Sequence, residues 1–241
     1  MFFLDCTLPT LAENLALDEA LLLEAESEPR ALASGVLRVW QWPHYAVVLG
    51  ASGRIADDVH EDHCRADGVP LARRSSGGGT VLLGPGCLLY TLVLPYDLDP
   101  ALTQIRSSYC YILGRIKEAL NAIAADLDVG GSSDIAWRDR KVSGNAQQRK
   151  RTHLMHHGSL LYDFDFERAA RYLKLPPRQP DYRRQRDHGD FLTNLPADAA
   201  MLTRCLRDVW RSSDELVNLP LARVQALVAE RYSWDEWIRR R

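Results

Sequence analysis

The sequence predicts a fold of the α+β or mixed α/β class, in which helices cover one sheet. Strand-like and helix-like segments are interspersed along the chain, and several neighbouring strand-like segments are separated only by short turns. No GxGxxG pattern follows a strand-like segment, so a dinucleotide-binding Rossmann unit is not expected. The 241 residues, 46% of them hydrophobic, fit one domain or one domain with a small appendage.

The first element is an amphipathic helix. Apolar residues spaced three and four apart among acids predict a helix over 11–26. Asn14 is a candidate N-terminal cap, and Asp18 and Glu19 then lie near the positive end of the helix dipole.

The later elements are assigned in the same way, from two-residue alternation and β-branched residues for strands and from spacings of three and four for helices. We expect, in chain order, a hairpin of 36–42 and 46–50, a helix over 57–68, strands over 69–74, 80–83 and 88–94, a helix over 105–127 stopped by Gly130-Gly131, a hairpin of 134–137 and the segment from Val142, a strand over 153–163, a helix over 166–173, and two or three surface helices after Ala197.

Composition excludes several protein classes. The net charge of −2 and pI of about 6.4 argue against a protein that coats nucleic acid. No apolar run has the roughly 18–20 residues of a membrane helix, and the first residues lack the pattern of a signal peptide. The five cysteines are scattered, with no CxxC pair, which favours a reducing, cytoplasmic location over a disulfide framework or zinc ribbon.

A run of three glycines interrupts the strand pattern in residues 73–80 (RRSSGGGT). Each glycine costs roughly 0.5–1 kcal/mol relative to alanine. Consecutive N–H groups without side chains can form an anion-binding concavity, and the flanking arginines and hydroxyls suit a phosphate or carboxylate. The alternative is a glycine bulge at a sheet corner beside solvated arginines.

A second unusual segment covers 134–158. Lys141 follows a predicted turn and precedes small residues, so its ammonium could lie over a bound anion; the alternative is an exposed turn lysine. Adjacent histidines on a strand point to opposite faces, so His156 and His157 are a poor metal pair. A metal cluster that includes His153 stays an alternative to histidines packed in the sheet.

Together these segments closely resemble the lipoate-protein ligase A family, within the biotin/lipoate ligase superfamily. The family motif R-R-x-S-G-G-G-x-V is matched by 73–81, and its D-[LI] strand by 134–135. The motifs K-[VI]-S-G-x-A and H-H-G-[ST]-L-L are matched by 141–146 and 156–161. The resemblance covers roughly residues 10–195.

This resemblance implies a central mixed or antiparallel sheet flanked by helices, the class II synthetase-like catalytic domain, over 1–195. Residues 196–241 would then be a short helical extension, without the family's full accessory domain. The implied reaction joins lipoate or octanoate to ATP as an acyl-adenylate, with Mg²⁺ screening the phosphates, and passes the acyl group to a lysine of an acceptor protein.

The resemblance also implies the site residues. Lys141 is the expected catalytic residue, bridging the acyl carbonyl and the α-phosphate. No protein side chain is expected to be a metal ligand. The expected substrate- and nucleotide-binding residues are Arg74, Ser76, Gly77, Gly78, Gly79, Thr80, Val81, Leu82, Asp134, Ser143, Gly144, Ala146, His157 and Gly158.

Departures from the family pattern keep two alternatives open. Leu82 replaces an aromatic residue, and Cys87 stands where the family has Asn. Neither cysteine position of the superfamily's octanoyltransferases is filled, so Cys87 is the alternative nucleophile of an acyl-carrier thioester transferase, unless it is a buried structural cysteine. The other alternative is a non-catalytic subunit that binds lipoyl domains.

The expected partners are an acceptor lipoyl domain or an H-like protein of glycine cleavage, and a separate accessory subunit. The basic stretches 149–151 and 168–186 would dock an acidic acceptor, unless they are simply solvated. No nucleic-acid or membrane partner is expected.

Overall fold

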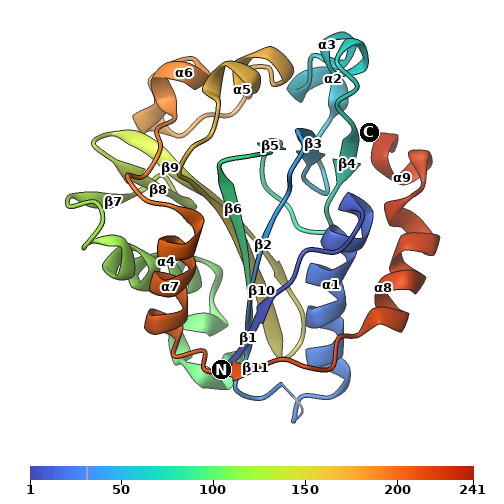
Figure 1. Ribbon diagram of the computed structural model, residues 1–241, viewed down its shortest axis with the longest axis vertical. Helices are drawn as coiled ribbons and strands as arrows, with labels where there is room; N and C mark the ends of the chain where they lie inside the picture. Colours follow the sequence, from blue (N-terminus) through green and yellow to red (C-terminus); the bar gives the residue numbers. More distant parts are fainter. Residues whose placement is uncertain (31) are drawn as a thin grey trace.

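The computed structural model describes residues 1–30 and 32–241, which form two sheets between helices (Figure 1). The larger sheet has eight strands in the order β11-β1-β2-β6-β10-β9-β8-β7, and the smaller has the order β4-β3-β5. The strands are β1 (Phe2–Asp5), β2 (Val36–Gln41), β3 (Ala46–Leu49), β4 (Leu71–Arg73), β5 (Val81–Leu83), β6 (Cys87–Pro95), β7 (Leu127–Gly130), β8 (Asp134–Trp137), β9 (Arg140–Arg149), β10 (His153–Leu161) and β11 (Asp214–Glu215).

Helices cover both faces of the large sheet. On one face lie α1 (Leu11–Ser27), α8 (Leu221–Leu227) and the small sheet, and on the other lie α4 (Ile105–Leu120) and α7 (Ala199–Trp210). The remaining helical segments are α2 (Ile55–Asp58), α3 (Glu61–Ala66), α5 (Phe166–Tyr172), α6 (His188–Phe191), α9 (Asp235–Arg239), three 3-10 turns (Tyr96–Leu98, Pro100–Thr103, Asp181–Arg183) and a π turn (Val228–Tyr232).

The centre of the large sheet explains its apolar sequence. Strand β6 (CLLYTLVLP) is buried along its whole length between β2 and β10, because helices cover both of its faces. All pairings of the large sheet are antiparallel except those of β1 with β2 and β11. The predicted fold class, a mixed sheet flanked by helices, is confirmed.

Most predicted elements are present, but the hairpin of 36–42 and 46–50 is wrong. Both edges of β2 are occupied by β1 and β6, whereas β3 pairs with β4 and β5 in the small sheet. The turn at Pro43-His44 therefore carries the chain from one sheet to the other.

Three helix predictions also need correction. Thr10, not Asn14, caps α1, and it forms a capping box with Glu13. The helix predicted over 57–68 is divided into α2 and α3, since the His60 N–H donates to the Tyr172 carbonyl of α5. The long helix ends at Leu120, and β7 occupies 127–130.

The glycines after that helix have a different role from the one predicted. Gly130 ends β7, and Gly131, with φ of +57°, lies in the turn before β8. They therefore serve a strand-to-strand connection and not the end of a helix.

The segment after Ala197 packs on the body of the protein. Helix α7 buries Leu202, Leu206 and Trp210 against the core, and β11 pairs with β1 at the edge of the sheet. The division into residues 1–195 and 196–241 stays a prediction.

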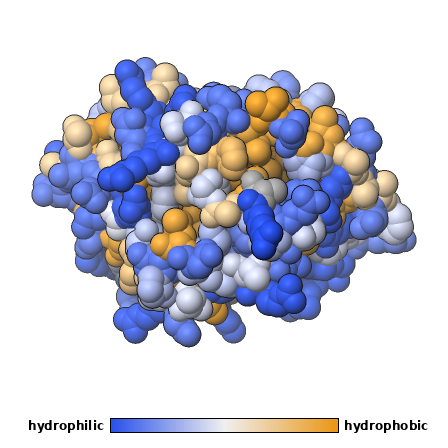
Figure 2. Space-filling view, turned by 90° about the horizontal axis from the view of Figure 1, so that it is seen from below, coloured by the Kyte–Doolittle hydropathy of each residue, from blue (hydrophilic) through white to orange (hydrophobic). Residues whose placement is uncertain are grey.

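The face of the molecule that Figure 2 shows is largely polar. Hydrophilic residues cover most of the face seen from below, with apolar groups between them (Figure 2). No helix within residues 1–30 and 32–241 has the length and apolar character needed to cross a membrane.

His156 on β10 generates a pH prediction. The ring is fully buried, accepts a hydrogen bond at Nδ1 from the Gln147 amide, stacks with Tyr90 and contacts Tyr109 edge to face. Burial lowers the pKa of His156 from 6.5 to about 3. Between these values the unfolded chain binds a proton that the folded chain does not, so stability falls as the pH falls, by about 1.4 kcal/mol per pH unit.

We therefore expect His156→Gln to flatten the decline of the unfolding free energy, measured with urea between pH 7 and pH 4. The slope should decrease by up to about 1.4 kcal/mol per pH unit. The exposed His44→Gln is the matched control. Parallel curves for wild type and His156→Gln would contradict a neutral, buried His156.

Candidate active site

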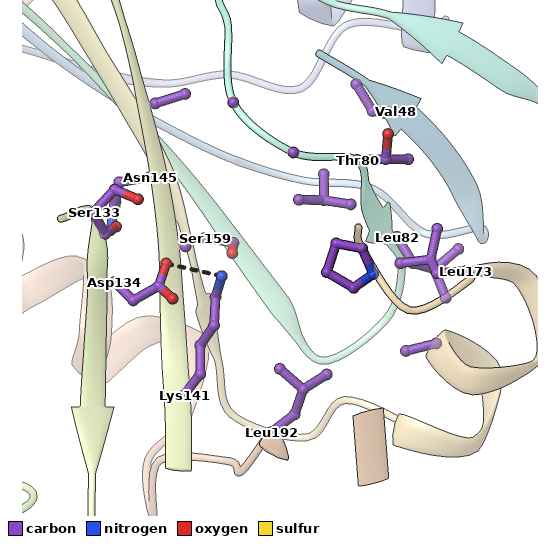
Figure 3. A pocket seen from close by; sticks show the side chains of 18 of the residues that line it. Val48, Thr80, Leu82, Ser133, Asp134, Lys141, Asn145, Ser159, Leu173 and Leu192 are labelled. Carbon is purple, nitrogen blue, oxygen red and sulfur yellow. Dashed lines mark hydrogen bonds and ion pairs between the residues drawn. The ribbon is translucent and has the colours of Figure 1, made fainter. Parts of the chain in front are cut away.

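A cavity of about 640 Å³ lies where the glycine run, β8, β9, β10 and the segment 173–183 meet. In Figure 3, Lys141 points toward Asp134 on one side, and Val48, Thr80, Leu82 and Leu173 lie on the other. The two unusual segments of the sequence, 73–80 and 134–158, therefore face the same cavity.

Lys141 is held by a carboxylate and by a glycine. Its Nζ lies 2.9 Å from Asp134 Oδ1, and the Tyr182 hydroxyl donates to Asp134 Oδ2 at 2.8 Å. A Cβ built on Gly144 would lie 2.7 Å from Nζ, so the absence of a side chain there lets the ammonium reach Asp134. The lysine is 24% exposed and faces the cavity, not bulk solvent.

Arg74 is buried among neutral oxygen atoms. Its Nη2 donates to the carbonyls of Gly77 at 2.7 Å and Gly79 at 2.8 Å, and its Nε donates to Ser76 Oγ at 3.0 Å. Nη1 donates to the Val48 carbonyl at 3.3 Å, which leaves one N–H of Nη1 without a partner among the described residues. Burial lowers the pKa of Arg74 to about 10, so the group stays charged at neutral pH.

The glycine run is explained by this arrangement. Gly78 has φ of +87°, and a Cβ on it would lie 2.9 Å from Arg74 Nη2. The run thus turns two carbonyls onto the guanidinium, a role that the sequence did not indicate.

A row of polar contacts runs behind the loop. Asp18 Oδ1 lies 2.6 Å from Arg38, and Asp18 Oδ2 lies 3.5 Å from His157 Nδ1. His157 Nε2 lies 2.6 Å from Ser76 Oγ. A carboxylate only accepts, so we assign the hydrogen to Nδ1, and Nε2 then accepts from the serine.

The contacts of Asp18 with Arg38 and His157 also determine its ionisation state. Burial acts to raise the pKa of Asp18, but Arg38 and His157 outweigh it and the pKa is lowered. The carboxylate therefore stays ionised beside the His157 ring, and Ser76 is positioned against Arg74. Sequence reasoning placed Asp18 only in the helix dipole and missed this contact.

The deep part of the cavity is apolar. Its walls come from α1, β2, β3, β5, β6, β10 and α5 with the residues around them, namely Leu15, Trp40, Val48, Leu82, Leu83, Leu89, Leu161, Phe164, Ala169 and Leu173. An apolar space next to cationic groups suits an acyl chain that carries one carboxylate.

The mouth of the cavity is polar and comes from a stretch that the sequence analysis marked only as basic. Lys174, Arg178, Gln179, Asp181 and Arg183 line it.

Asn145 is a further site residue that the sequence did not indicate, although it stands inside the motif matched by 141–146. Its amide donates to the Ser133 carbonyl at 2.8 Å, and its Oδ1 accepts from Tyr90. A Cβ on Gly158 would collide with that oxygen.

Most of the predicted site residues line the cavity, and three do not. Ser76 and Ser143 are buried behind its wall, and Gly77 contributes its carbonyl to Arg74. The residues that line it are Arg74, Gly78, Gly79, Thr80, Val81, Leu82, Asp134, Lys141, Gly144, Ala146, His157 and Gly158. Their roles in catalysis and binding stay predictions.

Cys87 lies outside the cavity wall. It is 2% exposed, and burial raises the pKa of its thiol to about 12. Within the described part of the chain, neither Lys141 nor Arg74 contributes to this pKa shift, so neither provides the cationic neighbour that a thiolate nucleophile needs. Among the described residues, no group of three His, Cys, Asp or Glu side chains could hold a metal ion.

Comparison with known proteins identifies the family. The model of the lipoyl protein ligase A/B catalytic domain matches residues 10–199. The chain belongs to this family. The resemblance to lipoate-protein ligase A seen in the sequence motifs is confirmed.

Two curated relatives carry different names within this family. A Mycoplasma pneumoniae protein named "Probable lipoate-protein ligase A" is 28% identical over 162 residues, 67% of this chain and 45% of that protein. The octanoyltransferase LipM of Clostridioides difficile is 26% identical over 185 residues, 68% of this chain and 66% of that protein. The chain spans about half the length of the ligase relative.

Solved structures share the fold at low identity. A bi-partite lipoate protein ligase from Thermoplasma acidophilum, described with its E2 lipoyl domain, has a TM-score of 0.79 at 20% identity, over 99% of this chain and 95% of that chain. A Thermoplasma acidophilum structure with lipoic acid and a lipoate-protein ligase A with ATP each have a TM-score of 0.78 at 20% identity, over 99% or more of this chain and 99% of theirs.

The Lys141–Asp134 pair can be tested through Gly144. In Gly144→Ala the new Cβ would lie 2.7 Å from Lys141 Nζ and 2.8 Å from Cε, so the flexible ammonium must move away from Asp134. We expect the melting temperature to change by only a few degrees, while acetylation of Lys141 by acetic anhydride, followed by mass spectrometry, becomes several-fold faster.

Gly114→Ala on α4 is the matched control, because a Cβ there meets no atom within 4 Å. Unchanged labelling of Lys141 in Gly144→Ala would contradict the inferred role of Gly144.

Proposed function

We propose that this chain is the catalytic chain of a lipoate-protein ligase. It activates lipoate or octanoate with ATP and transfers the acyl group to a lysine of a lipoyl domain or an H-like protein. One observation carries the proposal: the Lys141 ammonium and the buried Arg74 guanidinium face one cavity whose deep part is apolar.

The residues present fit an acyl chain and a nucleotide phosphate. The apolar wall suits the hydrocarbon part of the acid, and the free N–H of Arg74 and the Lys141 ammonium suit the carboxylate and phosphates. The relatives solved with lipoic acid and with ATP support this choice of ligands. Mg²⁺ would arrive with the triphosphate, since the described side chains offer no metal cluster.

Two steps follow from this placement. A carboxylate oxygen of the acid attacks the α-phosphorus, forming the acyl-adenylate as the bond to pyrophosphate breaks. The ε-amine of the acceptor lysine then attacks the acyl carbon, an amide forms, AMP leaves, and the amine proton passes to solvent. Lys141, between the acyl carbonyl oxygen and the α-phosphate, would stabilise the negative charge that grows in both steps.

The acceptor and a second subunit belong to the same proposal. The Thermoplasma ligase described with its lipoyl domain is bi-partite, and this chain matches 95% of that chain. We propose that residues 196–241 are a short extension and that a separate subunit supplies the accessory function in the cytoplasm.

Lys141→Ala tests the ligase directly. We expect transfer from synthetic lipoyl-adenylate to a lipoyl domain to fall at least about 100-fold, the usual effect of removing one charge-stabilising donor. The melting temperature should stay close to that of wild type, because Asp134 keeps its hydrogen bond from Tyr182. Lys117→Ala on α4 is the control, and retained transfer by a folded Lys141→Ala would overturn the assigned role.

The transferase alternative keeps the support of the relative named octanoyltransferase, so it needs its own test. We expect Cys87→Ser to modify the acceptor at the wild-type rate with ATP and free lipoate, measured by mass spectrometry, because the thiol is buried away from the cavity. The exposed Cys110→Ser is the control. Transfer from an octanoyl carrier protein without ATP, lost in Cys87→Ser, would replace the ligase by the transferase.

A further inference from the structure

The first arginine of the glycine loop, Arg73, does not face the cavity. Its guanidinium is almost fully buried, and Nη1 donates to the carbonyls of Gly50 and Gly53, each at 2.8 Å. Nε and Nη2 donate to the Ile238 carbonyl at 2.9 Å and 2.7 Å, and Nε also reaches the Trp237 carbonyl at 3.1 Å. One side chain thus joins the turn 50–53 to α9.

The turn 50–53 is the support on which the glycine loop rests. The Ala51 N–H donates to the Ser76 carbonyl at 2.8 Å, and the Arg74 N–H donates to the Leu49 carbonyl at 3.0 Å. A Cβ on Gly50 would lie 2.1 Å from the Gly78 carbonyl oxygen, so the two backbones are in direct contact. Any displacement of this turn therefore moves the loop that carries Arg74.

Residues 228–240, which we call the terminal segment, hold the turn in further ways. The Trp237 indole N–H donates to the Arg73 carbonyl at 3.1 Å, and the Arg240 side chain lies over the Trp237 ring and donates to the Ala51 carbonyl. Figure 1 shows α9 beside β4, the strand that ends at Arg73.

The terminal segment is itself anchored on α1. Arg231 and the Tyr232 hydroxyl each lie 2.6 Å from a carboxylate oxygen of Glu19, which is 2% exposed. The segment lies beyond the residues 10–199 that match the family model. Its contacts therefore assign a role to a part of the chain that the family match does not cover.

We propose that the terminal segment positions the glycine loop through Arg73, and that Arg73 and Trp237 are positioning residues for the acyl-adenylate phosphate. This inference rests on the proposed function for the identity of the ligand. Loosening the segment lets the turn 50–53 and the loop move, and Arg74 then loses its alignment toward the phosphate. Much of the apolar wall for the acyl chain lies outside the turn and the loop, at Leu15 on α1, Leu89 on β6 and Leu161 on β10, and keeps its shape.

The test uses Trp237→Phe, which keeps an aromatic ring but removes the N–H donor, and Arg73→Lys, which keeps the charge but removes the forked donors. We expect the dissociation constant for lipoyl-adenylate, measured by titration calorimetry, to rise at least fivefold in both variants. The constant for free lipoate should stay within twofold of wild type. Trp234→Phe is the matched control in the same segment, where the side chain is half exposed.

Amide hydrogen exchange gives a second measurement that does not depend on the ligand. The Arg74 and Ala51 amides should exchange faster in both variants, while the amides of α4 keep wild-type rates. Equal weakening for lipoyl-adenylate and lipoate, or unchanged exchange at Arg74 and Ala51, would overturn the positioning role. If wild type binds lipoyl-adenylate no better than lipoate, the proposed function fails, and the exchange data still decide the positioning role.

If Arg73→Lys does not fold, Trp237→Phe alone carries the test.

Discussion

The site depends on a cation that is buried without a counter-ion. Arg74 is 7% exposed and forms no ion pair within the described part of the chain; its partners are one hydroxyl and three carbonyl oxygens. Dipoles alone compensate a buried charge only in part, so the free N–H favours an anion. The triglycine run follows from this constraint, because two of its carbonyls must turn onto one guanidinium and Gly78 must leave room for it.

Lys141 differs from Arg74, since the carboxylate of Asp134 already neutralises its charge. The two cations are thus prepared for different tasks, Arg74 for holding an anion and Lys141 for a charge that changes during a reaction.

The parts of the fold that the sequence predicted well are those specified by local pattern. The spacing of apolar residues predicted α1 and the core of α4, and a turn between two short β-rich segments predicted the hairpin of β8 and β9. The same kind of local pattern predicted a hairpin of β2 and β3, and there it failed: the two strands are neighbours in sequence but belong to different sheets, because their partners are distant in sequence. The cap of α1 was missed for a related reason. Asn14 has the composition of a cap, but its side chain binds the backbone of Leu8 and the buried Arg38, which a linear pattern does not show.

The residues of the site could be predicted from the sequence, but their contacts with one another could not. The glycines and Lys141 stand out in the sequence because their types are unusual for a strand, and the structure brings them to one cavity. The sequence did not predict which atoms of these residues contact one another. Gly78 of the loop, Gly144 of β9 and Gly158 of β10 each make room for a polar side chain, namely those of Arg74, Lys141 and Asn145. Asp18, Ser76 and His157 form a chain whose members are far apart in sequence and ordinary in composition, so only the folded backbone reveals it.

Two consecutive acids on α1, Asp18 and Glu19, contact segments that are far apart in the sequence and surround the site. Asp18 faces Arg38 on β2 and His157 on β10, whereas Glu19 faces Arg231 and Tyr232, 213 residues away in the case of the tyrosine. Both carboxylates are nearly buried, and removing one partner of a buried pair costs about 3–5 kcal/mol because the other charge is left uncompensated. Helix α1 therefore joins the centre of the sheet, the glycine loop and the terminal segment by interactions that are expensive to break singly. Since these partners are distant in sequence, the surroundings of Arg74 are built from segments that extend from α1 to α9.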